Sequence, residues 1–222
     1  MVNQSRSRQL SDDPTRNETI VAEDVSFEDF LRIYAEQHAE WLMGKVILIV
    51  TNNTMHQQIQ TLLVTLLNLF VSFRALGRVL SAGVPMFISD DQPAREPDVL
   101  VVLNAHLDRL KENRLEGPAD IAIEIVSPES AKRDRGDKFE EYEIAGVPEY
   151  WLIDPIHRDT GFWTLNDDGF YEACPRDSQG RLMSVVLPGF TLDPTLLWRD
   201  TPPTGQELMD LVQQMLASPS ER

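Results

Sequence analysis

The sequence predicts one mixed α/β domain in which helices flank a central β-sheet, and three observations carry this prediction. The segments PDVLVVL and ADIAIEIV are apolar at nearly every position, which is typical of strands covered on both faces. Residues 55–75 place apolar side chains at intervals of three and four, which predicts one long amphipathic helix. The chain has 222 residues, 42% of them hydrophobic, which is enough for one full-sized core.

The first part of the chain predicts an arm followed by a helix and a strand. Residues 1–22 are polar and are expected to form a flexible N-terminal arm. Ser26 predicts the N-cap of a helix that runs to about His38. Gly44 then indicates a tight turn before a strand over residues 45–50.

The rest of the domain alternates helices and strands. The long helix is expected to end at Gly77, and a helix that follows Ser127-Pro128 is expected to end at Gly146. Asp168-Gly169 predicts the turn of a hairpin. The other expected elements are strands over residues 84–89, 97–103, 119–126 and 148–155, a short helix or loop over 104–114, and a last strand before Trp198. The domain thus covers residues 23–200, and residues 201–222 add a C-terminal helix and tail.

Composition limits the functions open to the chain. The net charge of -16 argues against a protein that coats nucleic acid through bulk positive charge, although it allows an enzyme with a local basic patch. No apolar run is long enough to span a membrane, so we expect no membrane association. Cys174 is the only cysteine, so no intrachain disulfide forms. This fits a reducing compartment, and we expect a cytoplasmic protein.

Two acidic residues interrupt the apolar strands. Strand alternation places Asp98 on one face with Leu100, and Glu124 on one face with Ala122. An unpaired buried charge costs on the order of several kcal/mol, and two neighbouring carboxylates also repel each other. A divalent cation such as Mg²⁺ or Mn²⁺ prefers hard oxygen ligands and resolves both problems. The equally weighted alternative pairs each carboxylate with an arginine or a backbone amide.

A basic residue on the following helix is the next candidate. Lys138 shares a helix face with Asp134, Glu141 and Tyr142. A lysine directed at a metal site stabilises the charge that develops on a phosphorus centre, or it orients a water. The alternative is an exposed pair of Asp134 with Lys138, which contributes only a few tenths of a kcal/mol.

Four segments carry a family resemblance, namely EPDVLVV, IEIVSPES, DRGDKFEEYEIAGVPEYWLIDP and LPGFTL. With these segments, which span about residues 26–198, the chain resembles the Uma-two family, a restriction-endonuclease-like group within the PD-(D/E)XK nuclease superfamily. It implies a restriction-endonuclease-like core and a Mg²⁺ or Mn²⁺ cofactor. Asp98, Glu124 and the main-chain carbonyl of Ile125 are the implied metal ligands.

Two further positions follow from the same resemblance. Glu40 in EWLMGKV matches an early acidic residue of the family and is implied to help hold a metal. His56 stands where the family has a histidine, which implies a residue that lines the site. A half-buried histidine with a purely structural role is the alternative for His56.

One position departs from the superfamily pattern, which has a lysine two residues after the second acidic ligand. Val126 stands there in this chain. The resemblance implies that the lysine comes from the following helix, where Lys138 fits and Lys132 is the reserve candidate. Tyr142, one turn after Lys138, either contacts the site or packs.

The implied function is that of an endonuclease that hydrolyses phosphodiester bonds in DNA with a bound metal. Asp98, Glu124 and Lys138 are its expected catalytic residues. The first alternative is a non-catalytic binding or structural module with the same fold, forming a homodimer through the hairpin and the C-terminal helix. The second alternative is a hydrolase that uses Asp98 and Glu124 as an acid/base pair without metal.

Overall fold

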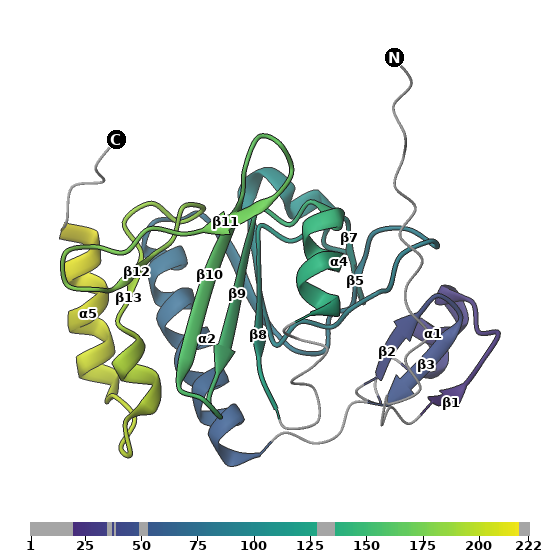
Figure 1. The fold of residues 1–222 in the computed structure, drawn as a ribbon, viewed down its shortest axis with the longest axis horizontal. Helices are drawn as coiled ribbons and strands as arrows, with labels where there is room; N and C mark the ends of the chain where they lie inside the picture. Colours follow the sequence, from purple (N-terminus) through teal and green to yellow (C-terminus); the bar gives the residue numbers. More distant parts are fainter. Residues whose placement is uncertain (1–19, 35–36, 38, 49–52, 128–135, 218–222) are drawn as a thin grey trace.

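A six-stranded mixed sheet forms the centre of the protein (Figure 1). The computed structural model describes residues 20–34, 37, 39–48, 53–127 and 136–217. In spatial order, the strands of the central sheet are β11 (Tyr171–Ala173), β10 (Asp159–Leu165), β9 (Glu149–Asp154), β8 (Ile121–Ile125), β6 (Val99–Leu103) and β4 (Gly77–Ser81). Only β8 and β9 run parallel, and the other neighbours in this sheet are antiparallel. The predicted mixed sheet is therefore confirmed.

Helices cover both faces of this sheet, as the continuous apolar strands predicted (Figure 1). One face packs against α2 (Thr54–Phe73), with α5 (Gly205–Ala217) packed against α2, and the other face packs against α4 (Asp137–Ala145). Alternate residues of β6 and β8 belong to the two clusters, because successive side chains of a strand point to opposite faces. None of the helices among the described residues is long and apolar enough to cross a membrane.

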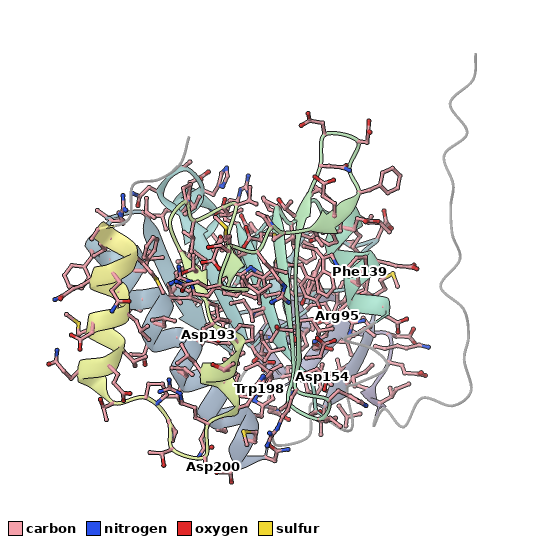
Figure 2. The ribbon with its side chains drawn as sticks, turned by 60° about the vertical axis from the view of Figure 1, so that its left-hand side comes forward. Arg95, Phe139, Asp154, Asp193, Trp198 and Asp200 are labelled. Carbon is pink, nitrogen blue, oxygen red and sulfur yellow. The ribbon has the colours of Figure 1, made fainter. Side chains whose placement is uncertain are left out.

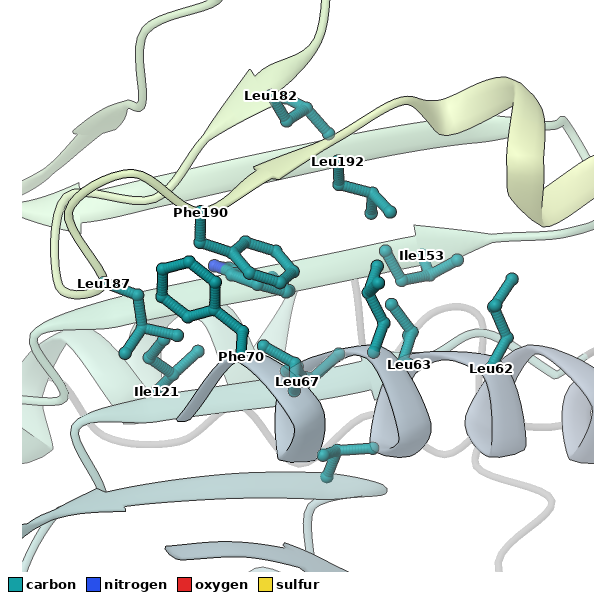
Figure 3. Packing of buried hydrophobic residues seen from close by; sticks show 14 of the residues in the cluster. Leu62, Leu63, Leu67, Phe70, Ile121, Ile153, Leu182, Leu187, Phe190 and Leu192 are labelled. Carbon is teal, nitrogen blue, oxygen red and sulfur yellow. The ribbon is translucent and has the colours of Figure 1, made fainter. Parts of the chain in front are cut away.

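The larger core lies between α2 and the sheet (Figure 3). Leu63, Leu67 and Phe70 of α2 point at β8 and β9, and Phe190 closes the cluster from the C-terminal segment. The ring centroids of Phe70 and Phe190 lie 5.4 Å apart in an edge-to-face arrangement. The long helix predicted from its apolar stripe is thus confirmed and fixes the sheet from one side.

The N-terminal part forms a small layer beside α4 (Figure 1). Its elements are β1 (Ile20–Ala22), α1 (Phe27–Ile33), β2 (Ala39–Leu42) and β3 (Lys45–Leu48), with the strands in the order β1-β3-β2. Two main-chain hydrogen bonds between Trp41 and Ala94 join β2 to the rest of the protein. This layer places the residues of β2 within reach of α4.

Several local predictions are confirmed, and others need correction. Ser26 caps α1 by accepting a hydrogen bond from Asp29 N, but the helix ends at Ile33 and not at His38. Residues 20–22 pair with β3 and so do not belong to the predicted flexible arm. The other residues predicted for that arm, 1–19, lie outside the described residues. The three glycines predicted to form a turn or to end a helix, Gly44, Gly146 and Gly169, all have a positive φ.

Short elements complete the fold. The predicted strand over 84–89 shrinks to two residues, and the segment over 104–114 begins with a 3₁₀ helix. Residues 128–135 lie outside the described residues, so the predicted helix after Ser127 is described only from its start at Asp137. The remaining elements are β5 (Met86–Phe87), η2 (Asn104–Arg109), β7 (Leu115–Glu116), β12 (Leu182–Met183), β13 (Thr191–Leu192) and η3 (Pro194–Trp198).

The long helix does not end at Gly77, which was the predicted stop. Its C-cap is Arg74, and Gly77 begins β4. The glycine is needed there because a Cβ at this position would lie 2.1 Å from the carbonyl oxygen of Val102 on β6. The close approach of the two strands, and not a helix terminus, therefore explains the glycine.

Gly77→Ala is expected to lower the free energy of unfolding by at least about 2 kcal/mol, because main-chain atoms on both sides of the clash cannot give way. Urea unfolding followed by tryptophan fluorescence measures this loss. Gly205→Ala is the matched control, since a Cβ at Gly205 meets no atom within 4 Å. Equal unfolding midpoints for the two variants would contradict the tight contact between β4 and β6.

Candidate active site

The two predicted acidic residues meet where β6 and β8 pair. Val99 of β6 lies opposite Ile123 of β8 in the antiparallel register. Continuing this register by one residue brings Asp98 opposite Glu124. The amide of Ile125 donates a hydrogen bond of 2.7 Å to Asp98 Oδ2, which ties the aspartate side chain to the end of β8.

Glu124 is buried and interacts with two residues of α4. Its Oε2 lies 2.8 Å from Lys138 Nζ, and its Oε1 accepts a hydrogen bond of 2.6 Å from the hydroxyl of Tyr142. Lys138 and Tyr142 are one helical turn apart, so the same face of α4 supplies both contacts. Burial and the neighbouring Glu124 carboxylate raise the pKa of Tyr142 well above its ordinary value. The phenol therefore stays protonated and donates to Glu124.

Lys138 reaches two carboxylates at once. Besides Glu124, its Nζ lies 3.3 Å from Glu40 Oε1 on β2. The lysine is buried, which excludes the predicted alternative of an exposed surface pair. Lys132, the reserve candidate, lies outside the described residues. Val126, which stands where the superfamily pattern has a lysine, is buried.

Arg95, which Figure 2 labels, joins the N-terminal layer to α4 and was not predicted from the sequence. Its Nη1 donates to Glu40 Oε2 at 2.7 Å, and its Nε and Nη2 donate to the two oxygens of Glu141 at 2.7 and 2.9 Å. Burial works against the charge of Arg95, but the two carboxylates outweigh it and raise the pKa of the guanidinium further. Glu40 thus faces Arg95 and Lys138.

Asp98 is held by the first two turns of α2. His56 Nε2 lies 3.1 Å from Asp98 Oδ2, and the side chain of Gln60 donates to the main-chain carbonyl of Asp98 at 2.8 Å. The side chain of Asp98 keeps 14% of its surface exposed, whereas His56 is buried. Asp98 is therefore partly open to solvent, whereas Glu40 and Glu124 are buried.

The structure brings all the predicted site residues into one connected cluster and adds Arg95, Glu141 and Gln60 to it. Its strongly charged members are Asp98, Glu40, Glu124, Glu141, Arg95 and Lys138. Among the described residues, the cluster thus contains four carboxylates and two basic side chains. Clustered carboxylates make it a candidate site for a further cation.

The oxygens of Asp98, Glu124 and the Ile125 main chain are of the donor type that Mg²⁺ prefers. Among the described residues, no group of three or more His, Cys, Asp or Glu side chains is arranged to hold a metal. Mg²⁺ does not need such a group, because it keeps several waters and often takes only one or two carboxylates. Asp98 and Glu124, with the main-chain carbonyl of Ile125, supply hard oxygen ligands of this kind.

Another buried carboxylate illustrates what a structural role looks like. Glu149 of β9 accepts hydrogen bonds from Trp151 Nε1, the hydroxyl of Ser184 and the amides of Val185 and Val186. Burial raises the pKa of Glu149, although these hydrogen bonds oppose the shift. All four donors belong to the fold, so Glu149 fixes the turn before β13 and is not a site residue.

A mixed sheet between helices, with two acids and a lysine converging at one strand pair, defines a restriction-endonuclease-like protein. The Uma2 family, whose description reads "Putative restriction endonuclease", matches residues 27–195, and the chain belongs to this family. No curated protein matches the chain.

Several solved chains are similar in fold to this protein. One of them is described as a putative nuclease belonging to DUF820 from Anabaena variabilis ATCC 29413. The two chains share 19% sequence identity, and the alignment covers 78% of this chain and 97% of the other with a TM-score of 0.65. At this identity the likeness supports the fold, and the site must be argued from its own residues.

Proposed function

We propose that the protein is a Mg²⁺-dependent endonuclease that hydrolyses phosphodiester bonds in DNA. Membership of the Uma2 family supports the nuclease class. The observation that carries the proposal is that three segments of the chain bring a lysine and two acids together. The buried Lys138 lies against Glu124, and Asp98 is held directly beside Glu124. Lys138 on α4 would thereby supply the lysine that is absent at Val126, directly after β8.

Each residue of the cluster then has a distinct task. Asp98, Glu124 and the carbonyl of Ile125 would hold Mg²⁺, or Mn²⁺ in its place. The ion supplies a water of lowered pKa and offsets charge on the scissile phosphate. Lys138, held by Glu124, donates to a phosphate oxygen or to the attacking water as negative charge develops.

Glu40 receives a different assignment from the predicted metal contact. Its two oxygens face Arg95 and Lys138, so we assign it to positioning the lysine. Tyr142 similarly positions Glu124 through its 2.6 Å hydrogen bond. The proposed homodimer and the cytoplasmic location stay predictions.

Metal removal tests the proposal. The wild-type protein is expected to nick supercoiled plasmid DNA in millimolar Mg²⁺ or Mn²⁺ and to stop when EDTA is added, because the proposed hydrolysis needs the bound ion. A structured RNA incubated in parallel tests the choice of DNA. Crystals soaked in Mn²⁺ should show anomalous density between Asp98 and Glu124.

Two results would count against a metal-dependent endonuclease. A metal-loaded protein that cuts neither DNA nor RNA, with no Mn²⁺ density at Asp98, would favour the non-catalytic module with the same fold. Cleavage that persists in excess EDTA would instead favour the acid/base pair without metal. The experiment therefore separates the three functions that the sequence left open.

A further inference from the structure

Two buried polar residues interrupt the apolar face of α2 at its first turns. His56 and Gln60 are one helical turn apart, and both are buried. Further along, the buried face of the helix is made of leucine, isoleucine, valine and phenylalanine. Polar side chains at such positions need partners, and both find the same partner residue, Asp98.

The contacts fix Asp98 in a defined way. Gln60 donates to its main-chain oxygen at 2.8 Å, while His56 Nε2 and the amide of Ile125 meet its side chain. Both side-chain contacts fall on Oδ2, at 3.1 and 2.7 Å. The carboxylate is therefore anchored through one oxygen, and Oδ1 is the oxygen left to bind a ligand.

We propose that His56 is a positioning residue that, together with the Ile125 amide, makes Asp98 present Oδ1 alone to the metal. This inference rests on the proposed function. Because the carboxylate accepts, Nε2 of His56 carries the proton in this contact. A metal-binding carboxylate that accepts a hydrogen bond on its other oxygen is oriented before the ion arrives.

The remaining nitrogen of His56 argues against a mainly structural role. Nδ1 is buried and has no hydrogen-bond partner among the described residues. Leaving a buried polar atom unsatisfied is unfavourable for stability. An apolar side chain at this position would avoid that penalty, so the histidine contributes through Asp98 and not through the packing of α2.

The experiment measures Mn²⁺ binding by titration calorimetry in the full chain, with four proteins compared. His56→Leu is expected to weaken Mn²⁺ binding by about 10–100-fold, the range typical for loss of an outer-shell partner. His56→Gln should recover most of the affinity, because its amide nitrogen reaches the place of Nε2. The matched control is His106→Leu, which removes another histidine–carboxylate pair, His106 with Asp120, on the segment after β6. This control should bind as the wild type does.

Crystal structures of the metal-free variants supply a second readout. Asp98 should take more than one rotamer in His56→Leu and a single rotamer in His56→Gln. Unchanged Mn²⁺ affinity in His56→Leu, or equally weak binding by both His56 variants, overturns the inference about His56 and leaves the proposed function standing. A wild-type protein that binds no Mn²⁺ overturns the proposed function and this inference with it.

Discussion

Replacing Glu124 by glutamine is expected to lower metal-dependent plasmid cleavage by at least about 10³-fold in a protein that stays folded. Glutamine keeps both contacts of the glutamate, since its oxygen accepts from Lys138 and its amide group donates to the Tyr142 oxygen. The substitution therefore removes mainly the negative charge. Loss of a metal ligand should cost more than the ~10²–10³-fold that follows removal of one transition-state donor. Cleavage rates, with circular dichroism as the check on folding, measure the effect.

Lys138→Met removes the opposite charge from the same pair and serves as the matched variant. It should lower cleavage by about 10²–10³-fold, because the lysine stabilises developing charge. It should also strengthen Mn²⁺ binding, since the ammonium no longer neutralises Glu124 and Glu40. Glu124→Gln should instead weaken Mn²⁺ binding. Both variants should therefore lose cleavage activity, but their Mn²⁺ affinities should change in opposite directions.

Stability distinguishes the same two variants. Without metal, Lys138→Met removes the cation that lies against the buried carboxylates of Glu124 and Glu40, so the variant should lose about 3–5 kcal/mol of unfolding free energy. Mn²⁺ should then raise its melting temperature more than that of the wild type, because binding to the folded state adds stability. Equal Mn²⁺ affinity in Lys138→Met and Glu124→Gln would contradict a metal ligand at Glu124.

The core of the site could be predicted because its signals are local. Asp98 and Glu124 are carboxylates in apolar strands, and only a cation or strong hydrogen-bond donors make such positions tolerable. The alternation of each strand fixes which face carries the acid, and pairing of neighbouring strands brings the two together. Lys138 and Tyr142 share a helix face by spacing alone. The strand and helix patterns need only a few consecutive residues, whereas the register that places Asp98 beside Glu124 is known from the structure.

The rest of the site depends on contacts between distant segments. Arg95 meets Glu40, which lies 55 residues away, and Glu141, which lies 46 residues away. Nothing in the segment DDQPAREPD marks this arginine as buried. The sequence did contain an indirect signal, since Glu40 and Glu124 together need more positive charge than Lys138 supplies. Similarly, β4 was missed because its residues are only partly buried at the edge of the sheet.

Arg95→Met should be the most destabilising substitution among the surroundings of the site. The guanidinium makes three hydrogen bonds to Glu40 and Glu141, and its side chain is only 2% exposed. Its removal takes from Glu141 its bidentate partner and leaves Lys138 as the cation beside Glu40, and breaking a buried ion pair typically costs about 3–5 kcal/mol. The loss should appear as a lower urea midpoint. Part of it should be recovered in Arg95→Met/Glu141→Leu, because the second substitution removes one of the carboxylates left unpaired.

Arg114→Met provides the matched control. Arg114 also makes charge-assisted hydrogen bonds, to Glu116, but the two side chains are 24% and 41% exposed. Water solvates both groups after the pair is broken, so the expected loss is below about 1 kcal/mol. If Arg95→Met unfolded at the urea concentration of Arg114→Met, the buried network would contribute nothing beyond an ordinary surface pair. If the double variant recovered no stability, the loss would come from the packing of the arginine stem and not from the unpaired Glu141. The network positions Lys138 only if the charges of Arg95 and its partners, and not the volume of the arginine side chain, hold α4 to β2.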